Sequence, residues 1–243
     1  MDSKKTILDL IYVKTHFFSF EKEYVENKLI TFLSPIKYIV ARKHLEYVEG
    51  FDVINIDGYS LLSLLKRFKI ISSLVVRRSF DFSSLADSAF QYASKNQLKV
   101  CLIGTHPFLI GKAIQNIKEK YPTLNIVFYR DGYFKNKEDE LDTTNRIIAE
   151  NPDIVICGMG IGKQELFLLN LRKLGWRGTG VTCGGFLHQI SAGLDYFPEW
   201  SNKYNLRWLY RLYREPNLLY TRFYKILHFI ILFLRDVREY KKR

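Results

Sequence analysis

A glycine-rich turn follows an apolar run in the second half of the chain, where residues 154–165 read IVICGMGIGKQE. The turn and the polar residues after it are Gly158, Gly160, Gly162, Lys163, Gln164 and Glu165. The spacing matches neither the dinucleotide fingerprint G-x-G-x-x-G nor a P-loop, which ends in G-K-[ST]. Glycines between a strand and a helix let backbone N–H groups approach an anion closely, and Lys163 and Gln164 could then bind a diphosphate or a sugar hydroxyl. The alternative is an ordinary tight turn, which explains one glycine well and three poorly.

Two aspartates also follow apolar runs. Asp57 ends the run VINI and precedes Gly58, so its carboxylate could act as a general base at the end of a strand. Aspartate is also a good N-cap, and from spacing alone we favour a cap for a helix that begins near Tyr59. Asp131 precedes Gly132, a pair typical of a tight turn.

Short apolar runs alternate with helical patterns along residues 28–184. The runs that predict strands are 28–34, 51–58, 99–104, 125–130, 153–158 and 178–184. The segments that predict helices are 36–50, 85–98, 107–120, 139–150 and 163–174. This alternation predicts an α/β fold, a Rossmann-like parallel sheet with helices on both faces. In such sheets ligands bind beyond the carboxyl ends of the strands, where Asp57, Gly104, Asp131, Gly158 and Gly184 all fall.

The pattern changes after Pro198, where the chain becomes helical and rich in aromatic residues. We therefore predict a catalytic domain over residues 1–194 and a basic helical appendage over 195–243. The first appendage helix is expected to carry three arginines on one face: Arg207, Arg211 and Arg214. This face is either a solvated surface or a phosphate clamp near a membrane interface. The apolar run 226–234 is too short to span a bilayer, which needs about 20 residues.

Charge and composition narrow the function classes. The net charge is +12, and half of that excess lies in residues 195–243. A basic tail could meet nucleic acid, an anionic membrane or a phosphorylated ligand, but no nucleic-acid motif is present. No Asp-x-Asp pair occurs, which argues against a diphosphate clamped by a divalent metal, and we expect neither a metal nor a cofactor. Three separated cysteines and the lack of a signal-peptide pattern suit a reducing cytosol.

Three segments, taken in order, resemble the WecG/TagA/CpsF glycosyltransferase family. They are CLIGTHPFLIGKAIQNIKEKYPTLNIVFYRDGYF (101–134), NPDIVICGMGIGKQE (151–165) and LRWLYRLYREP (206–216). The resemblance runs from about Lys28 to Arg235. It implies an inverting, metal-independent transferase on the cytoplasmic membrane face, which moves a sugar from UDP to an undecaprenyl-diphosphate-linked sugar for capsule, exopolysaccharide or teichoic acid synthesis. An N-acetylmannosamine-type sugar is frequent in the family.

The resemblance also implies roles for individual residues. Asp57 falls on the family's proposed catalytic base, Gln164 in its substrate loop, and the three appendage arginines over the lipid diphosphate. Ser34 stands where the family has an asparagine, and Gly162 where it has a proline. These departures leave the donor sugar open and motivate a second hypothesis, an accessory subunit that assists a partner glycosyltransferase. Apolar surface on the appendage could also support a homo-oligomer.

Overall fold

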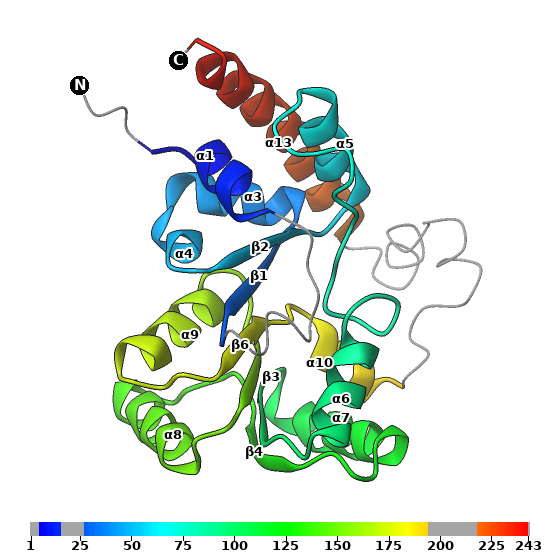
Figure 1. Ribbon diagram of the computed structural model, residues 1–243, viewed down its shortest axis with the longest axis vertical. Coiled ribbons are helices and arrows are strands. Elements are labelled where there is room, and N and C mark those ends of the chain that lie inside the picture. The colour runs from blue at the N-terminus through cyan, green and yellow to red at the C-terminus, as the bar shows by residue number, and fades with distance from the viewer. Residues whose placement is uncertain (1–4, 16–26, 194–217, 243) are drawn as a thin grey trace.

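The computed structural model describes residues 5–15, 27–193 and 218–242. Its centre is a six-stranded sheet in which every paired neighbour is parallel, in the order β2-β1-β6-β5-β3-β4 (Figure 1). The strands are β1 (Leu29–Leu33), β2 (Val53–Ile56), β3 (Val100–Gly104), β4 (Ile126–Arg130), β5 (Ile154–Gly158) and β6 (Thr179–Thr182). All six predicted strands are therefore confirmed, and with them the α/β class.

Helices connect and cover these strands. They are α1 (Ile7–Lys14), α3 (Pro35–Lys43), α4 (Glu46–Glu49), α5 (Tyr59–Arg67), α6 (Ala86–Lys95), α7 (Pro107–Lys120), α8 (Lys137–Glu150), α9 (Lys163–Lys173), α10 (Phe186–Ser191) and α13 (Leu218–Tyr240). The single helix expected over 36–50 is instead two, because the chain leaves helical geometry at His44. The sequence patterns did not predict α1 or α10.

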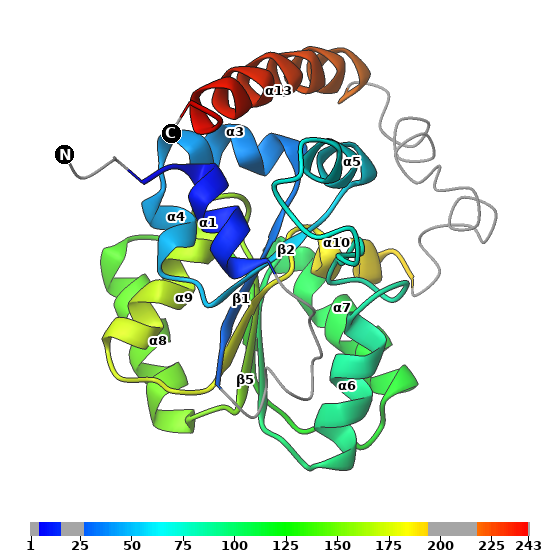
Figure 2. The ribbon, with the colours of Figure 1, turned by 45° about the horizontal axis from the view of Figure 1, so that its top comes forward.

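The two faces of the sheet bury separate sets of side chains, which explains why the strands read as continuous apolar runs. Ile30 and Phe32 point to the face covered by α6, α7 and α10. Leu29 and Leu33 alternate to the other face, where α8 and α9 cover one half and α1, α3 and α5 the other (Figure 2). The predicted arrangement of helices on both faces is confirmed.

Local signals fix the start of α3, the helix that follows β1. The Ser34 hydroxyl accepts a hydrogen bond from the backbone N–H of Lys37, at 3.3 Å, and caps the helix. Pro35 occupies the first helical turn, where its missing N–H costs nothing. These two residues turn the chain sharply at the end of β1 and place the first turn of α3 at the carboxyl edge of the sheet.

The C-terminal helix α13 packs against α3, on the outer side of the helices that cover β1 and β2 (Figure 2). Phe229 and Phe233 are fully buried against the ring of Tyr38. Asp236 accepts hydrogen bonds from the Tyr38 hydroxyl, at 2.8 Å, and from Arg42. The last helix of the predicted appendage therefore belongs to the core beside α1, α3 and α5, while the expected boundary at 194/195 lies outside the described residues.

Candidate active site

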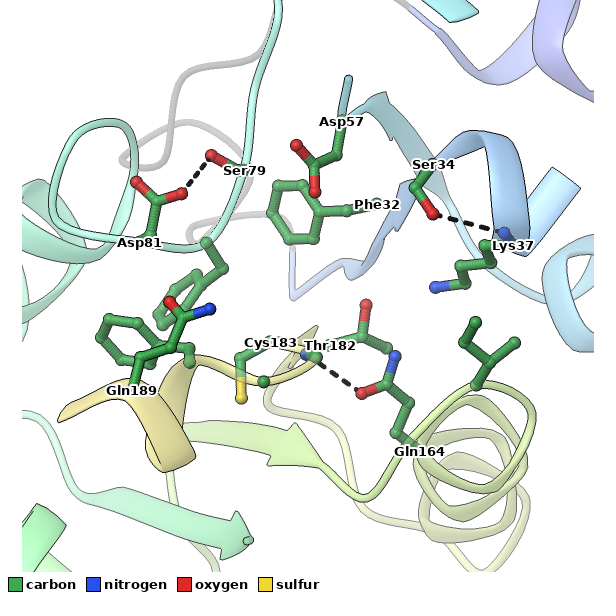
Figure 3. A pocket seen from close by; sticks show the side chains of 15 residues that line it. Phe32, Ser34, Lys37, Asp57, Ser79, Asp81, Gln164, Thr182, Cys183 and Gln189 are labelled. Atoms are coloured by element: carbon green, nitrogen blue, oxygen red, sulfur yellow. Dashed lines mark hydrogen bonds between the residues drawn. The ribbon is translucent and has the colours of Figure 1, made fainter. Parts of the chain in front are cut away.

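A pocket of about 160 Å³ opens at the carboxyl edge of β1, β2 and β6 (Figure 3). Its lining residues are Phe32, Ser34, Lys37, Asp57, Ser79, Phe80, Asp81, Ile161, Gln164, Thr182, Cys183, Gly184, Gly185, Phe186 and Gln189. A cavity of about 150 Å³ holds one benzene ring, so the pocket can admit a ring from its open side. The structure thus brings together four of the predicted site residues: Ser34, Asp57, Gln164 and Gly184.

Asp57 lies at the end of β2 with its carboxylate turned into the pocket (Figure 3). It does not cap α5, since Gly58 occupies the N-cap position and makes no side-chain capping bond; the interpretation favoured from spacing is wrong. The carboxylate instead accepts a hydrogen bond from Arg77, at 2.9 Å. The Asp57 side chain is 37% exposed, so it is both oriented by a cation and accessible to a substrate.

Gln164 is held at both ends of its side-chain amide. The amide nitrogen donates to Glu165, at 2.7 Å, and the amide oxygen accepts from the backbone N–H of Gly184, at 3.1 Å. Glu165 is itself fully buried and accepts a hydrogen bond from the backbone N–H of Gly162, at 2.6 Å. The loops after β5 and β6 are thereby tied to each other through one side chain, which fixes the floor of the pocket.

Lys37 also reaches this floor from the first turn of α3. Its ammonium forms a 2.5 Å ion pair with Glu165 and donates to the Thr31 hydroxyl, at 2.6 Å. The Thr31 and Thr182 hydroxyls lie 3.0 Å apart and join β1 to β6. Burial lowers the pKa of Lys37, and the neighbouring Glu165 carboxylate opposes that shift.

The predicted site glycines at the strand ends pack backbone against backbone. A Cβ on Gly104 would lie 2.4 Å from the carbonyl oxygen of Gly158, its partner in the β3–β5 register. A Cβ on Gly158 would lie 2.7 Å from both the Gly184 oxygen and the Cys183 sulfur. The turns after β3, β5 and β6 are therefore in contact. Together they form a close-packed glycine strip along the carboxyl edge, in which Gly104 and Gly158 leave no room for a Cβ.

Other predicted residues lie apart from the pocket. Lys163 and Gly160 are exposed and are not among its lining residues. Glu165 lies beneath it as an ion-pair partner. Asp131 accepts a hydrogen bond from the Tyr133 backbone N–H and lines a separate open hollow beside β4. Arg207, Arg211 and Arg214 lie outside the described residues. Substrate binding by these residues stays a prediction.

Several lining residues had no signal in the sequence. Asp81 faces Asp57 across the pocket (Figure 3) and is fixed by hydrogen bonds from Ser79 and Ser83. Arg77, which does not line the pocket but binds Asp57, comes from the long connection between α5 and α6, and Lys37 comes from what reads as an ordinary amphipathic helix. No short motif links these positions. Sequence proximity to Ser34 is the one clue that pointed toward Lys37.

Two chemical properties of the described part of the chain bear on the reaction. Residues 5–15, 27–193 and 218–242 contain no group of three His, Cys, Asp or Glu side chains arranged to hold a metal ion. All three cysteines are buried free thiols, and burial raises the pKa of Cys183, in the pocket wall, to about 12. The pocket thus offers an oriented carboxylate, a fixed amide and a buried ammonium, a set suited to positioning hydroxyl groups and taking a proton from one.

Comparison with known proteins places this geometry in context. The model of the family described as "Glycosyl transferase WecG/TagA/CpsF family" matches residues 17–243. The UDP-Gal:alpha-D-GlcNAc-diphosphoundecaprenol beta-1,4-galactosyltransferase of Shigella boydii is 32% identical over 217 residues, covering 87% of this chain and 90% of that protein. The N-acetylglucosaminyldiphosphoundecaprenol N-acetyl-beta-D-mannosaminyltransferase of Bacillus subtilis is 25% identical over 219 residues, covering 87% and 84%.

Among solved structures, an extracellular ligand-binding receptor from Rhodopseudomonas palustris covers 63% of this chain and 59% of its own. It shares 15% sequence identity with this chain, and the TM-score of 0.31 is too low to bear on fold or function.

Proposed function

The chain belongs to the WecG/TagA/CpsF family of glycosyltransferases, and from that premise we propose that it transfers a hexose from a UDP-sugar to an undecaprenyl-diphosphate-linked sugar. Asp57 and Gln164, predicted from separate segments, line one pocket. This observation carries the proposal. The two relatives described above are named for different transferred sugars, galactose and N-acetylmannosamine. The donor is therefore proposed as a hexose of either kind.

In the proposed mechanism Asp57 is the general base. The hexose ring lies in the pocket with its anomeric carbon toward Asp57, and the acceptor hydroxyl approaches from the face opposite UDP. Asp57 removes the hydroxyl proton as the oxygen forms a bond to the anomeric carbon. The bond from that carbon to the diphosphate breaks, UDP leaves, and the configuration inverts. Arg77, at 2.9 Å, orients the carboxylate.

The diphosphate of the donor is proposed to lie on the glycine strip formed by the turns after β3, β5 and β6. Glycines that follow strands leave the backbone open to close approach by phosphate oxygens, and Gly184 has open space where a side chain would stand. Arg207, Arg211 and Arg214 are proposed to add positive charge over the leaving group. Preorganised donors of this kind stabilise developing charge in a site from which water is excluded. The proposal contains no divalent metal.

The test is the variant Asp57→Asn, which keeps the shape of the side chain and removes the base. UDP release is followed with UDP-galactose and UDP-N-acetylmannosamine as donors and a short-chain polyprenyl-diphosphate N-acetylglucosamine as acceptor. A general base contributes about 10²- to 10⁴-fold in rate, so turnover should fall by that factor. The Asp57–Arg77 pair is partly exposed and should contribute less than about 1 kcal/mol to stability. The variant should therefore unfold close to the wild-type temperature.

Near wild-type turnover by Asp57→Asn would remove Asp57 from the mechanism. A wild-type chain that releases no UDP alone but stimulates a partner glycosyltransferase would favour the accessory role. That role remains the second candidate because Ser34 and Gly162 depart from the family pattern.

We also propose that the basic C-terminal region holds the protein on an anionic membrane surface, where its acceptor lipid lies. No helix in the described ranges is long and apolar enough to cross a bilayer. Helix α13 does, however, expose Leu227, Ile231 and Leu234 along one stripe, with Arg235 and Arg238 beside it. Exposed apolar side chains next to basic ones are typical of helices that lie in a membrane interface.

The membrane proposal is tested with Ile231→Glu and Leu234→Glu combined, measured by cosedimentation with liposomes that contain anionic lipid. The control is Leu174→Glu, since Leu174 is 47% exposed, close to the 45% of Leu234, but lies between α9 and β6. The α13 variant should lose binding and the control should keep it. Equal binding by both variants would contradict a role for this stripe.

A further inference from the structure

Lys37 is a buried charged residue that the proposed reaction leaves without a role. Its side chain is 5% exposed, yet the residue belongs to the pocket lining (Figure 3). Arg77, the cation that pairs with Asp57, is by comparison 18% exposed. Lys37 thus places an ammonium group at the floor of the pocket, below the site assigned to the hexose.

Stability does not account for this arrangement. Taking a lysine and a glutamate out of water costs several kcal/mol per ion, and the attraction between them often only offsets that cost. Replacing such a pair with apolar residues of similar volume is often neutral or stabilising. A chain that keeps both charges buried beside a pocket therefore points to a use for the charge in that pocket.

The hydrogen-bond inventory of Lys37 shows an available donor. An ammonium group has three N–H donors. Glu165 accepts one at 2.5 Å and the Thr31 hydroxyl accepts a second at 2.6 Å. The structure records no third acceptor among the described residues, and the group borders the pocket rather than the closed core. The third donor is left for a ligand.

The neighbours of Lys37 indicate what kind of ligand atom it meets. Gln164 and Thr182 lie beside it, and Asp57 is near enough to affect its electrostatic environment. Glu165 pairs with Lys37, and the Asp57 and Asp81 carboxylates both lie within 4 Å of Arg77. Paired charges beside hydrogen-bonding side chains suit a neutral sugar with several hydroxyls.

We propose that Lys37 binds the donor hexose directly, donating its third N–H to a ring hydroxyl of the sugar and thereby contributing to donor selection. The inference rests on the proposed function. Gln164, fixed between Glu165 and Gly184, holds the same side of the ring. Lys37 thus acts on the sugar rather than on the diphosphate, and its loss weakens binding of the UDP-sugar and leaves UDP binding unchanged.

The experiment compares dissociation constants for UDP-galactose, UDP-N-acetylmannosamine and UDP by titration calorimetry on the full chain. The paired variant is Lys37→Met with Glu165→Gln, and it is compared with Glu165→Gln alone. Both keep one amide oxygen at 165 and lose one of the two acceptors that hold Gly162 and Gln164, so the difference between them reports on Lys37. The single variant Lys37→Met would leave Glu165 buried without its partner, a change expected to destabilise by about 3–5 kcal/mol. The control is Lys43→Met, at the exposed end of the same helix.

The paired variant should bind the UDP-hexose about 10- to 100-fold more weakly, the loss expected for one hydrogen bond from a charged group. Its affinity for UDP should stay within about threefold of wild type. An equal loss for UDP, or no loss for the UDP-hexose, overturns the assignment of Lys37 to the sugar. If the wild-type chain binds neither UDP-hexose and releases no UDP, the proposed function fails, and this inference fails with it.

Discussion

The docking of α13 onto the catalytic core can be tested by removing one buried ring. Phe233 is fully buried, and its ring lies 5.7 Å from Tyr38 and 6.0 Å from Phe68, between centroids. Replacing it with alanine removes the ring and leaves a cavity between α13, α3 and α5. Such substitutions cost about 3–5 kcal/mol.

The expected change in melting temperature follows from the size of the chain. A loss of 1 kcal/mol lowers the melting temperature of a domain of this size by about 2–4 °C, so Phe233→Ala should melt roughly 6–20 °C below wild type. The measurement is thermal unfolding followed by far-UV circular dichroism, with urea unfolding to obtain the free energy.

The control is Ile231→Ala, two residues away on the same helix, where the side chain is 59% exposed. A surface substitution of this kind should change the free energy of unfolding by less than about 0.5 kcal/mol. If Phe233→Ala unfolds like the wild type, as Ile231→Ala should, α13 does not pack on the core as described. A large loss for both would show that the exposed face of α13 is also covered.

Two further predictions concern the carboxyl edge of the sheet. Gly158→Ala should lower the free energy of unfolding by about 1–3 kcal/mol, because its Cβ would meet Cys183 and the Gly184 carbonyl at 2.7 Å. Gly111→Ala, with open space at its Cβ inside α7, should instead stabilise the protein by about 0.4–1 kcal/mol. Urea unfolding of both variants measures the contrast, and equal effects would refute the close packing at Gly158. All three thiols should resist a thiol reagent at pH 8 in the native protein and react only after unfolding. They are buried, and burial raises the pKa of Cys183 to about 12. Fast labelling of one thiol in the native protein would contradict its burial.

The sheet could be predicted from the sequence because its strands are buried on both faces. Such strands read as short apolar runs, and β1, β3 and β5 are buried along their whole length. The carboxyl-edge rule then predicts Asp57, Gln164 and Gly184 near one another from the sequence alone. Helix boundaries were also accessible where a cap or a proline marks them, as at Pro107, where α7 begins as predicted.

The partners of these residues could not be predicted, because contacts between distant segments leave no local pattern. Nothing in the sequence near Asp57 indicates that Arg77, twenty residues later, will orient its carboxylate. Lys37 and Glu165 are separated by more than half of the chain, and no pattern in the sequence pairs them. Asp236 falls in the predicted basic appendage, whereas in the structure its carboxylate is buried against Tyr38 and Arg42.

Helix α3 contributes both to the pocket and to the surface on which α13 packs. Its first turn forms a wall of the pocket through Ser34 and Lys37, and its next turns receive α13 through Tyr38 and Arg42. A deletion of residues 195–243 would therefore remove the packing partner of the helix that shapes the sugar site, as well as the C-terminal arginines. An inactive truncated protein would consequently say nothing about those arginines, and their contribution has to be measured by single substitutions in the intact chain.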